Sequence, residues 1–438
     1  MAVKRTAVNI VNAINNTVRK QYNVVLPTVT EKTFSDMASA LRTAPSAVVN
    51  AWEENLINLV GMQVVKNKRQ YESYFRKLHK GEIPTFDIQL EMTDLINARV
   101  YSPEANADEF FEDDRPDVAT QYANQILKVF YPVSINEESL IGAFLNTSAF
   151  DKFLQSIQTS LYSSLEQGDV DATKELIAKN IEEGNIRIET CPEPKDKDTA
   201  LAFGTKLKTV SRDMATEMSN EYNLSGLNTW TPQGEGVTIT TNDVEAVAEN
   251  YNMAWAFNAS LLDLTKTGEL ITTKSNGLAD GKVYAIYADN DAFEIRTITG
   301  FPKVRIQEFG NTLTKKEWLH NWALYTISYF NNAVAFADPS KVGIAAITLD
   351  TESGTKNVDR GKSVKVKVKS VTAPEGKVAD KFGTYAVAGA TDSDTVIDVH
   401  SGKLTVGKNE TAKTLTVTFT SHLDNTKTAD IAITVNGN

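Results

Sequence analysis

Four histidines and one cysteine are the residues of this sequence best suited to metal binding or nucleophilic catalysis. The histidines are His79, His320, His400 and His422. They lie far apart, and none stands in the His-x-x-x-His or Cys-x-x-Cys spacing that brings zinc ligands together. We therefore expect each of them to be a lone surface histidine. Cys191 lies in a polar, acidic stretch with no base nearby in sequence, so an inert thiol is predicted.

Three short motifs begin like phosphate or calcium loops, but each lacks a required residue. Gly361-Lys362-Ser363 ends like a Walker loop, yet Lys356 stands where the leading glycine should be. Gly234-Glu235-Gly236 lacks the third glycine of a dinucleotide-binding turn. Asp289-Asn290-Asp291 opens like a calcium loop, but Phe293-Glu294 replaces the invariant glycine and its neighbour. A plain surface turn is the better interpretation of the last motif.

Clusters of acidic and aromatic side chains give no stronger evidence of a functional site. The stretch 105–117 places four carboxylates around Phe110-Phe111, and we interpret it as a solvated loop, with a metal or a basic partner as the less favoured reading. The aromatic group at 318–329 is assigned to core packing and not to a ligand box. No pair of carboxylates has environments that the sequence distinguishes. We therefore predict no catalytic, cofactor-binding or metal-binding residue, no cofactor, and a protein that is not an enzyme.

Composition limits the classes of protein to which the chain can belong. It has 438 residues, 41% hydrophobic and 23% charged, which is ordinary for globular proteins and predicts two to four domains. Its 45 basic and 56 acidic residues give a net charge of −11, so contact with nucleic acid should be weak and local. A single cysteine forms no internal disulfide. Neither a signal peptide nor an uninterrupted apolar stretch of about 18 residues occurs, so we expect a soluble, intracellular protein.

The first third of the chain combines helical and extended patterns. Thr6 is a candidate cap for an amphipathic helix over 7–20, and a second helix is predicted over 46–60. After a predicted turn at Gly81, apolar and polar residues alternate over 86–92, which is typical of an extended strand with two different faces.

A much longer helix is predicted in the middle of the chain. Ser134 and Glu137 fit a capping box, and apolar residues then recur at helical spacing until Gly168. At about 1.5 Å per residue this helix would be roughly 50 Å long, which is unusual in a globular domain. A further helix is expected over 171–183, ending at Gly184.

The following stretch supplies the rest of the mixed region. A third helix is predicted over 242–262, and strands over 282–287 and 293–298. The aromatic stretch 318–329 fits a helix and a buried strand equally well, so periodicity leaves both open.

The composition changes near residue 341, after which tryptophan is absent and Thr, Val, Lys, Asp and Gly dominate. Valine and lysine alternate strictly over 363–369, and the stretch 413–420 alternates in the same way with threonine on the outer face. The same period closes the chain at Ile431, Ile433 and Val435. Strict alternation with turns between predicts an antiparallel sheet, and about seven such strands indicate an immunoglobulin-like (Ig-like) sandwich.

Three ordered stretches of the mixed region resemble one protein family. They are 240–258, 284–293, which contains Tyr287-Ala288-Asp289, and 322–336. In this order they resemble the major capsid protein of phi-29-like tailed phages, which has the Hong Kong 97 (HK-97) capsid fold. The resemblance implies an α+β fold over residues 1–341, with 2–22 as an N-terminal arm and 71–101 as an extended E-loop that reaches over a neighbouring subunit. It also implies a spine helix over 134–168 and an axial domain after residue 200.

The C-terminal part, residues 342–438, resembles a bacterial Ig-like domain of group 2. The stretch 394–406 carries the resemblance: it implies that Val396 and Val399 enter one strand, that Gly402 turns, and that Leu404 enters the next strand. Such domains are associated with phage surfaces. This likeness implies display on the outer surface and contact with host-surface carbohydrate or with adjacent subunits.

Together these readings predict a major capsid protein that assembles through pentamers and hexamers into an icosahedral or prolate head shell around double-stranded DNA, in the host cytoplasm. The short arm implies a separate scaffolding protein, and a portal is expected. DNA contact would be weak and non-specific, and no membrane partner is expected. Lysines lie near the presumed E-loop at Lys66, Lys68, Lys77 and Lys80, but no cross-linking residue is assigned.

Two other classes of protein remain as alternatives. An adhesin or cell-wall protein would use the Ig-like part for binding, but the sequence shows no signal peptide and no anchor. An enzyme with a carbohydrate-binding sandwich would need the acid–base or metal residues that the sequence lacks.

Overall fold

The computed structural model describes most of the chain. The described residues are 6–64, 78–84, 88–95, 118–123, 125–136, 141–144, 146–240, 244, 247, 250, 281–309 and 314–437. Among the predictions, the acidic stretch 105–117 lies outside these residues, as do Lys66, Lys68 and Lys77. The predicted helix 242–262 is described only at residues 244, 247 and 250, which are helical.

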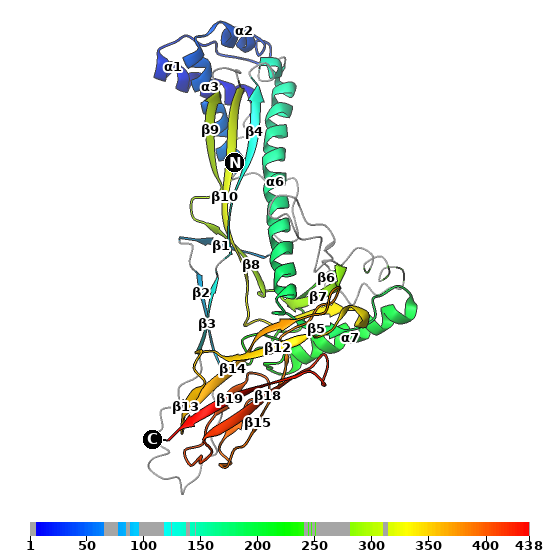
Figure 1. The fold of residues 1–438 in the computed structure, drawn as a ribbon. Helices are drawn as coiled ribbons and strands as arrows, with labels where there is room; N and C mark the ends of the chain where they lie inside the picture. The colour runs from blue at the N-terminus through cyan, green and yellow to red at the C-terminus, as the bar shows by residue number, and fades with distance from the viewer. Residues whose placement is uncertain are drawn as a thin grey trace, which may run out of the picture.

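The N-terminal helices form a cluster at one end of the molecule (Figure 1). They are α1 (Ala7–Tyr22), α2 (Asp36–Thr43) and α3 (Ser46–Val64). The predicted cap is confirmed, because the backbone N–H of Asn9 donates to Thr6 Oγ1 at 3.4 Å. The fully buried indole of Trp52 donates to Asn15 Oδ1 at 2.6 Å. Residues 7–22, which the resemblance assigns to an N-terminal arm, are part of a helical cluster, because α1 packs against α3 and α6.

A single helix, α6 (Thr147–Glu182), runs from the N-terminal helices to the sheet that contains β6 and β7 (Figure 1). Its 36 residues span about 54 Å. The long helix was predicted, but two of its features were wrong. Ser134 lies in a strand, and Asn146 caps the helix instead, accepting from the backbone N–H of Ala149 at 2.8 Å. The two predicted helices are one, because α6 continues through Gly168; its end before Gly184 was predicted correctly.

Gly168 serves a close approach and not a helix end. An ideal Cβ at this position would overlap the hydroxyl of Tyr131, whose buried ring packs on α6 beside Leu161 and Leu165. The absence of a side chain therefore lets strand β4 (Gln125–Asn136) lie directly on the helix.

Replacing Gly168 with alanine is expected to destabilise the protein by about 1–2 kcal/mol. Overpacking against Tyr131 costs about 1–3 kcal/mol, and the higher helix propensity of alanine offsets about 1 kcal/mol of that cost. Adding Tyr131→Phe should restore most of the loss, since the Cζ atom that remains lies 3.1 Å from the new methyl position. Urea unfolding of the single and double variants tests this. A single variant more stable than wild type would show that propensity dominates.

Strand β4 belongs to the larger mixed sheet, which has the order β1-β8-β10-β4, with β9 also paired to β10. Its other strands are β1 (His79–Ile83), β8 (Phe293–Ile298), β9 (Lys303–Phe309) and β10 (Thr314–Ile327). The aromatic stretch that periodicity left open is therefore a strand. The predicted turn at Gly81 was wrong, because this residue, with φ +103°, lies inside β1 where its register with β8 shifts.

A second sheet lies between two helices. Its order is β5-β11-β7-β6, formed by β5 (Arg187–Thr190), β11 (Ala333–Ala337), β7 (Val283–Asp289) and β6 (Gly236–Thr240). Along β11, Ala335 packs on the side of α6 residues Ile177 and Ile181, whereas Val334 and Phe336 face α7 (Lys197–Thr216). Burial on both faces explains the continuous apolar run of this strand. The strands predicted over 282–287 and 293–298 are confirmed as β7 and β8.

The C-terminal part is entirely β-structure after the short 3-10 helix η4 (Pro339–Lys341). Its strands are β12 (Ala346–Thr351), β13 (Asn357–Asp359), β14 (Ser363–Thr372), β15 (Gly383–Ala388), β16 (Val396–Ile397), β17 (Lys403–Thr405), β18 (Thr414–Ser421) and β19 (Thr428–Asn436). They form two four-stranded sheets, β12-β14-β17-β16 and β13-β19-β18-β15, around one apolar core.

The alternation predicted for these strands is confirmed. Val364, Val366 and Val368 of β14 are buried, and the alternate residues are more exposed. The assignment of Val399 was wrong: it lies in a turn and is 47% exposed, because β16 ends at Ile397. Leu404 enters β17 as expected and is fully buried.

Candidate functional site

A two-stranded hairpin stands apart from the larger sheets (Figure 1). It pairs β2 (Ile88–Thr93) with β3 (Val118–Ala123), which confirms the extended strand predicted over 86–92 for the described residues 88–92. Large apolar side chains are exposed on and beside it: Leu95 is 54%, Val118 59% and Tyr122 66% exposed. Exposed apolar groups on a narrow hairpin favour a contact with another surface.

Two polar side chains fix the hairpin to the rest of its own chain. The Gln121 amide donates to the carbonyl of Ile327 at 2.6 Å and accepts from the backbone N–H of Tyr329 at 2.8 Å. Asp94 Oδ1 accepts from the backbone N–H of Asn228 at 3.1 Å. The hairpin therefore lies beside the turn between β10 and β11.

The C-terminal β-structure is joined to the mixed part through a buried carboxylate. Asp380 is only 1% exposed. Its Oδ2 accepts from the backbone N–H of Ile188 at 2.6 Å and lies 2.8 Å from His422 Nε2. Its Oδ1 accepts from the backbone N–H of Phe382 at 3.1 Å. One side chain thus links β5 to two loops of the C-terminal part.

Further contacts make this junction extensive. The backbone N–H of Lys381 donates to the carbonyl of Gly184 at 3.0 Å, just beyond the end of α6. Val342 and Val378 form an isolated β-bridge and belong to the same apolar core as Ile188. The C-terminal part is therefore docked on the mixed part and not merely tethered to it.

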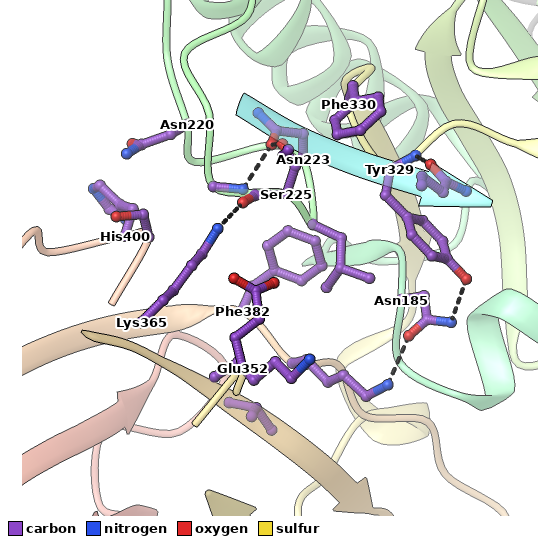
Figure 2. A pocket seen from close by; sticks show the side chains of 18 of the residues that line it. Asn185, Asn220, Asn223, Ser225, Tyr329, Phe330, Glu352, Lys365, Phe382 and His400 are labelled. Carbon is purple, nitrogen blue, oxygen red and sulfur yellow. Dashed lines mark hydrogen bonds between the residues drawn. The ribbon is translucent and has the colours of Figure 1, made fainter. Parts of the chain in front are cut away.

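A cavity of about 740 Å³ lies at this junction (Figure 2). Its walls come from β3 of the hairpin, from the loop 220–226, from the turn at Tyr329, and from the β14 region of the C-terminal part. On one side Lys365 Nζ donates to the carbonyl of Ser225 at 2.5 Å; on the other, the Asn185 amide donates to Tyr329 Oη at 3.3 Å (Figure 2). This volume is typical of a small-molecule pocket.

Lysines dominate the charge of the cavity: Lys365, Lys367, Lys369 and Lys381 line it. Lys381 is half-buried and its ammonium donates to Asn185 Oδ1 at 2.7 Å. Burial lowers the pKa of Lys381, Glu183 opposes that change, and the nearby charge of Lys367 adds to the lowering. The arrangement can therefore attract a negatively charged group.

The sequence-predicted site residues do not come together. Cys191 is buried, and burial raises the pKa of its thiol. His79 Nε2 lies 2.8 Å from Thr297 Oγ1, and His320 lies beside Phe130. Only His400 borders the cavity. The turn at Asp289-Asn290-Asp291 is confirmed between β7 and β8, where the backbone N–H of Asp291 donates to Asp289 Oδ1 at 2.8 Å.

Sequence reasoning missed the residues of the junction. His422 was expected on the surface, but its side chain is 16% exposed and lies against Asp380. No local pattern marks these residues, because their partner, Ile188, is more than 190 positions away from Asp380. Within the described ranges, no group of three or more His, Cys, Asp or Glu side chains is placed to hold a metal ion. None of the helices described is long and apolar enough to cross a membrane.

Comparison with known proteins places the chain in a family. The family model described as Phi29-like phage major capsid protein matches residues 11–337. The major capsid protein of Bacillus phage GA-1 is 28% identical over 309 residues, 68% of this chain and 63% of that protein. The chain thus spans less than two thirds of this relative. The major capsid protein of Bacillus phage PZA is 24% identical over 331 residues, 75% of this chain and 72% of that protein.

Solved structures that are similar to the chain also come from phages. The capsid structure of Staphylococcus phage Andhra has a TM-score of 0.46 at 12% identity, over 62% of this chain and 85% of that chain. A structure of Mycobacterium phage Bobi has a TM-score of 0.38 at 11% identity, over 62% of this chain and 92% of that chain. Because the family model covers most of the sequence, the chain belongs to the Phi29-like phage major capsid protein family.

Proposed function

We propose that this protein is a shell-forming subunit with the HK-97 fold, assembling through pentamers and hexamers into an icosahedral or prolate head around double-stranded DNA. The family match carries the proposal. The described parts support such a subunit: α6 would be the spine helix, and the sheet between α6 and α7 part of the axial domain. Of the E-loop expected over residues 71–101, β2 lies in the two-stranded hairpin with β3, whereas β1 pairs with β8 in the mixed sheet. Closed shells need repeated contacts that one subunit makes with several copies.

The C-terminal part is proposed to be an Ig-like domain of residues 342–438, next to a capsid domain of residues 1–341, and to be displayed on the outer surface. Its two four-stranded sheets around a separate core support this division. The junction through Asp380 implies a fixed orientation on the capsid domain and not a free tether.

Further partners are part of the same proposal. A separate scaffolding protein and a portal would act during assembly in the host cytoplasm, and the Ig-like domain would contact carbohydrate or adjacent subunits. The net charge of −11 favours only weak, non-specific contact with packaged DNA, since tight phosphate binding needs clustered basic residues.

The proposal is tested by changing the hairpin surface. Replacing Leu95 and Val118 with aspartate should reduce shell formation at least tenfold, because both side chains are more than half exposed and would be buried against a neighbour. The change should leave the fold intact, since neither side chain is in the core. Sedimentation and negative-stain electron microscopy of the expressed protein, with and without a scaffolding partner, measure the yield of shells.

The matched control replaces Val396 and Val399 of the C-terminal part, which are 55% and 47% exposed, with aspartate. This control should assemble like the wild type. Normal shells from the Leu95 and Val118 variant would contradict the role of the hairpin. A wild-type protein that stays monomeric in all conditions would contradict the shell function itself.

A further inference from the structure

The junction cavity has an excess of positive charge that the described side chains do not balance. Of its four lysines, Lys369 is paired with Asp350 at 3.2 Å. Within the described part of the chain, Lys365 and Lys381 donate to neutral oxygens, of Ser225 and Asn185. Lys367 has no ion pair among the residues that the structure describes.

The carboxylates near the cavity compensate this charge only in part. Glu221 shares Arg187 with Glu189: Arg187 Nη2 lies 2.9 Å from Glu221 Oε1, and Arg187 Nε lies 3.0 Å from Glu189 Oε1. Glu183 acts on Lys381 from outside the lining, and it is 4.0 Å from Lys179. Among the described residues that line the cavity, Glu352 is the one carboxylate for which no ion pair with another described residue is found (Figure 2). Against Lys365, Lys367 and Lys381, one free carboxylate leaves a positive cavity in a chain whose net charge is negative.

The positive charge also has a defined focus. Lys367 of β14 and Lys381 both line the cavity, and the charge of Lys367 lowers the pKa of Lys381. Lys381 is held there by Asn185 and is half-buried. Burial and the like charge of Lys367 both disfavour the charged form of Lys381, and an anion bound in the cavity would add to the opposing effect of Glu183.

We infer that this cavity binds an anionic ligand whose carboxylate or phosphate group lies between Lys367 and Lys381. Charge-assisted hydrogen bonds from both ammonium groups would hold the acidic group. The body of the ligand would lie toward Tyr122 and Phe382, which supply aromatic surface in the same lining. The inference is independent of the shell function, since all of the lining belongs to one chain.

One negatively charged ligand could come from two sources, a small acidic metabolite or the acidic stretch of a second copy. Residues 104–117 contain seven carboxylates and a single arginine, Arg115. Calorimetric titration of the full chain should therefore use four probes: glucuronic acid, glucose 6-phosphate, neutral glucose, and a synthetic peptide of residues 104–117. At least one acidic probe should bind ten or more times more tightly than glucose, and less tightly as salt is raised.

The double change Lys367→Gln and Lys381→Gln should weaken that binding at least tenfold. Lys362→Gln, which removes an exposed charge from the same strand region outside the cavity, should leave it unchanged. Thermal unfolding of each variant checks that the fold persists. Lys367 is exposed, so the single variant Lys367→Gln should keep its fold and still weaken binding, even if Lys381→Gln disturbs the structure around the cavity. Preference for the peptide identifies a second copy as the source, and preference for a small acid identifies a metabolite. Equal binding of glucose, no binding of any acidic probe, or binding unaffected by the lysine changes would overturn the inference.

Discussion

The Glu410→Ala variant is expected to lose about 3–5 kcal/mol of unfolding free energy, confined to the C-terminal β-structure. Glu410 is fully buried, and five donors converge on its carboxylate: the N–H and hydroxyl of Thr391, the N–H of Asp392, the hydroxyl of Thr395 and the N–H of Ala412. Alanine would leave these donors without an acceptor, at about 1–3 kcal/mol for each that water fails to reach. Calorimetry should show an early transition for this part.

Acid should reproduce part of this loss in the wild type. Burial raises the pKa of Glu410, but hydrogen bonds from Thr391, Ala412 and Thr395 outweigh it and hold the pKa far below its usual value. Because the pKa of Glu410 is lower in the folded than in the unfolded chain, the Glu410 carboxylate stabilises the fold fully above its unfolded-state pKa of about 4.3. This stabilisation is lost as the pH falls below that value. The variant should therefore lose less stability between pH 5 and about pH 3 than the wild type.

The exposed Glu375 of the same part is the matched control, and Glu375→Ala should change stability by no more than about 0.5 kcal/mol. Equal melting of Glu410→Ala and wild type would show that the five donors find other acceptors.

The Asp380→Ala variant is expected to separate the C-terminal part from the mixed part. The change removes the acceptor for the N–H groups of Ile188 and Phe382 and leaves His422 facing a cavity. The expected cost is about 3 kcal/mol, since each buried donor that loses its partner costs about 1–3 kcal/mol. We expect the two parts to unfold in separate transitions, and trypsin to cleave faster after Lys341, the exposed last residue of η4.

Asp430→Ala, at an exposed position of β19, controls for the loss of a carboxylate from the same sheet region. Asp380→Asn should lose less junction stability than Asp380→Ala, because the asparagine amide keeps one oxygen that accepts a hydrogen bond. Unchanged cleavage after Lys341 in the alanine variant would show that the apolar contacts of Val342 and Val378 suffice to hold the junction.

The strands of the C-terminal part could be predicted because apolar and polar residues alternate between neighbouring positions of each strand. Val364, Val366 and Val368 of β14 are buried and the lysines between them are more exposed, so the alternation in the sequence predicts which side chains enter the core. The turn between β7 and β8 was equally readable from Asp289-Asn290-Asp291. The apolar spacing also predicted a long helix in this region, although α6 begins later than expected and continues through Gly168.

Features that depend on a distant partner were not predictable. Gly168 resembles a helix end in the sequence, whereas its role is set by Tyr131 on another element. Ser134 and Glu137 satisfy the capping pattern, but pairing with β10 keeps Ser134 in a strand. The lysine cavity escaped notice for the same reason, since Asn185, Tyr329 and Lys381 meet only after the C-terminal part has docked.

Helix α6 connects two places that are otherwise remote. Its first turns, through Phe150 and Leu154, belong to the core of the N-terminal cluster, and the carbonyl of Gly184 just past its end accepts from Lys381. A continuous helix transmits tilt with little bending over such a length. Any contact that tilts the N-terminal cluster would therefore displace the C-terminal β-structure at the opposite end of the helix.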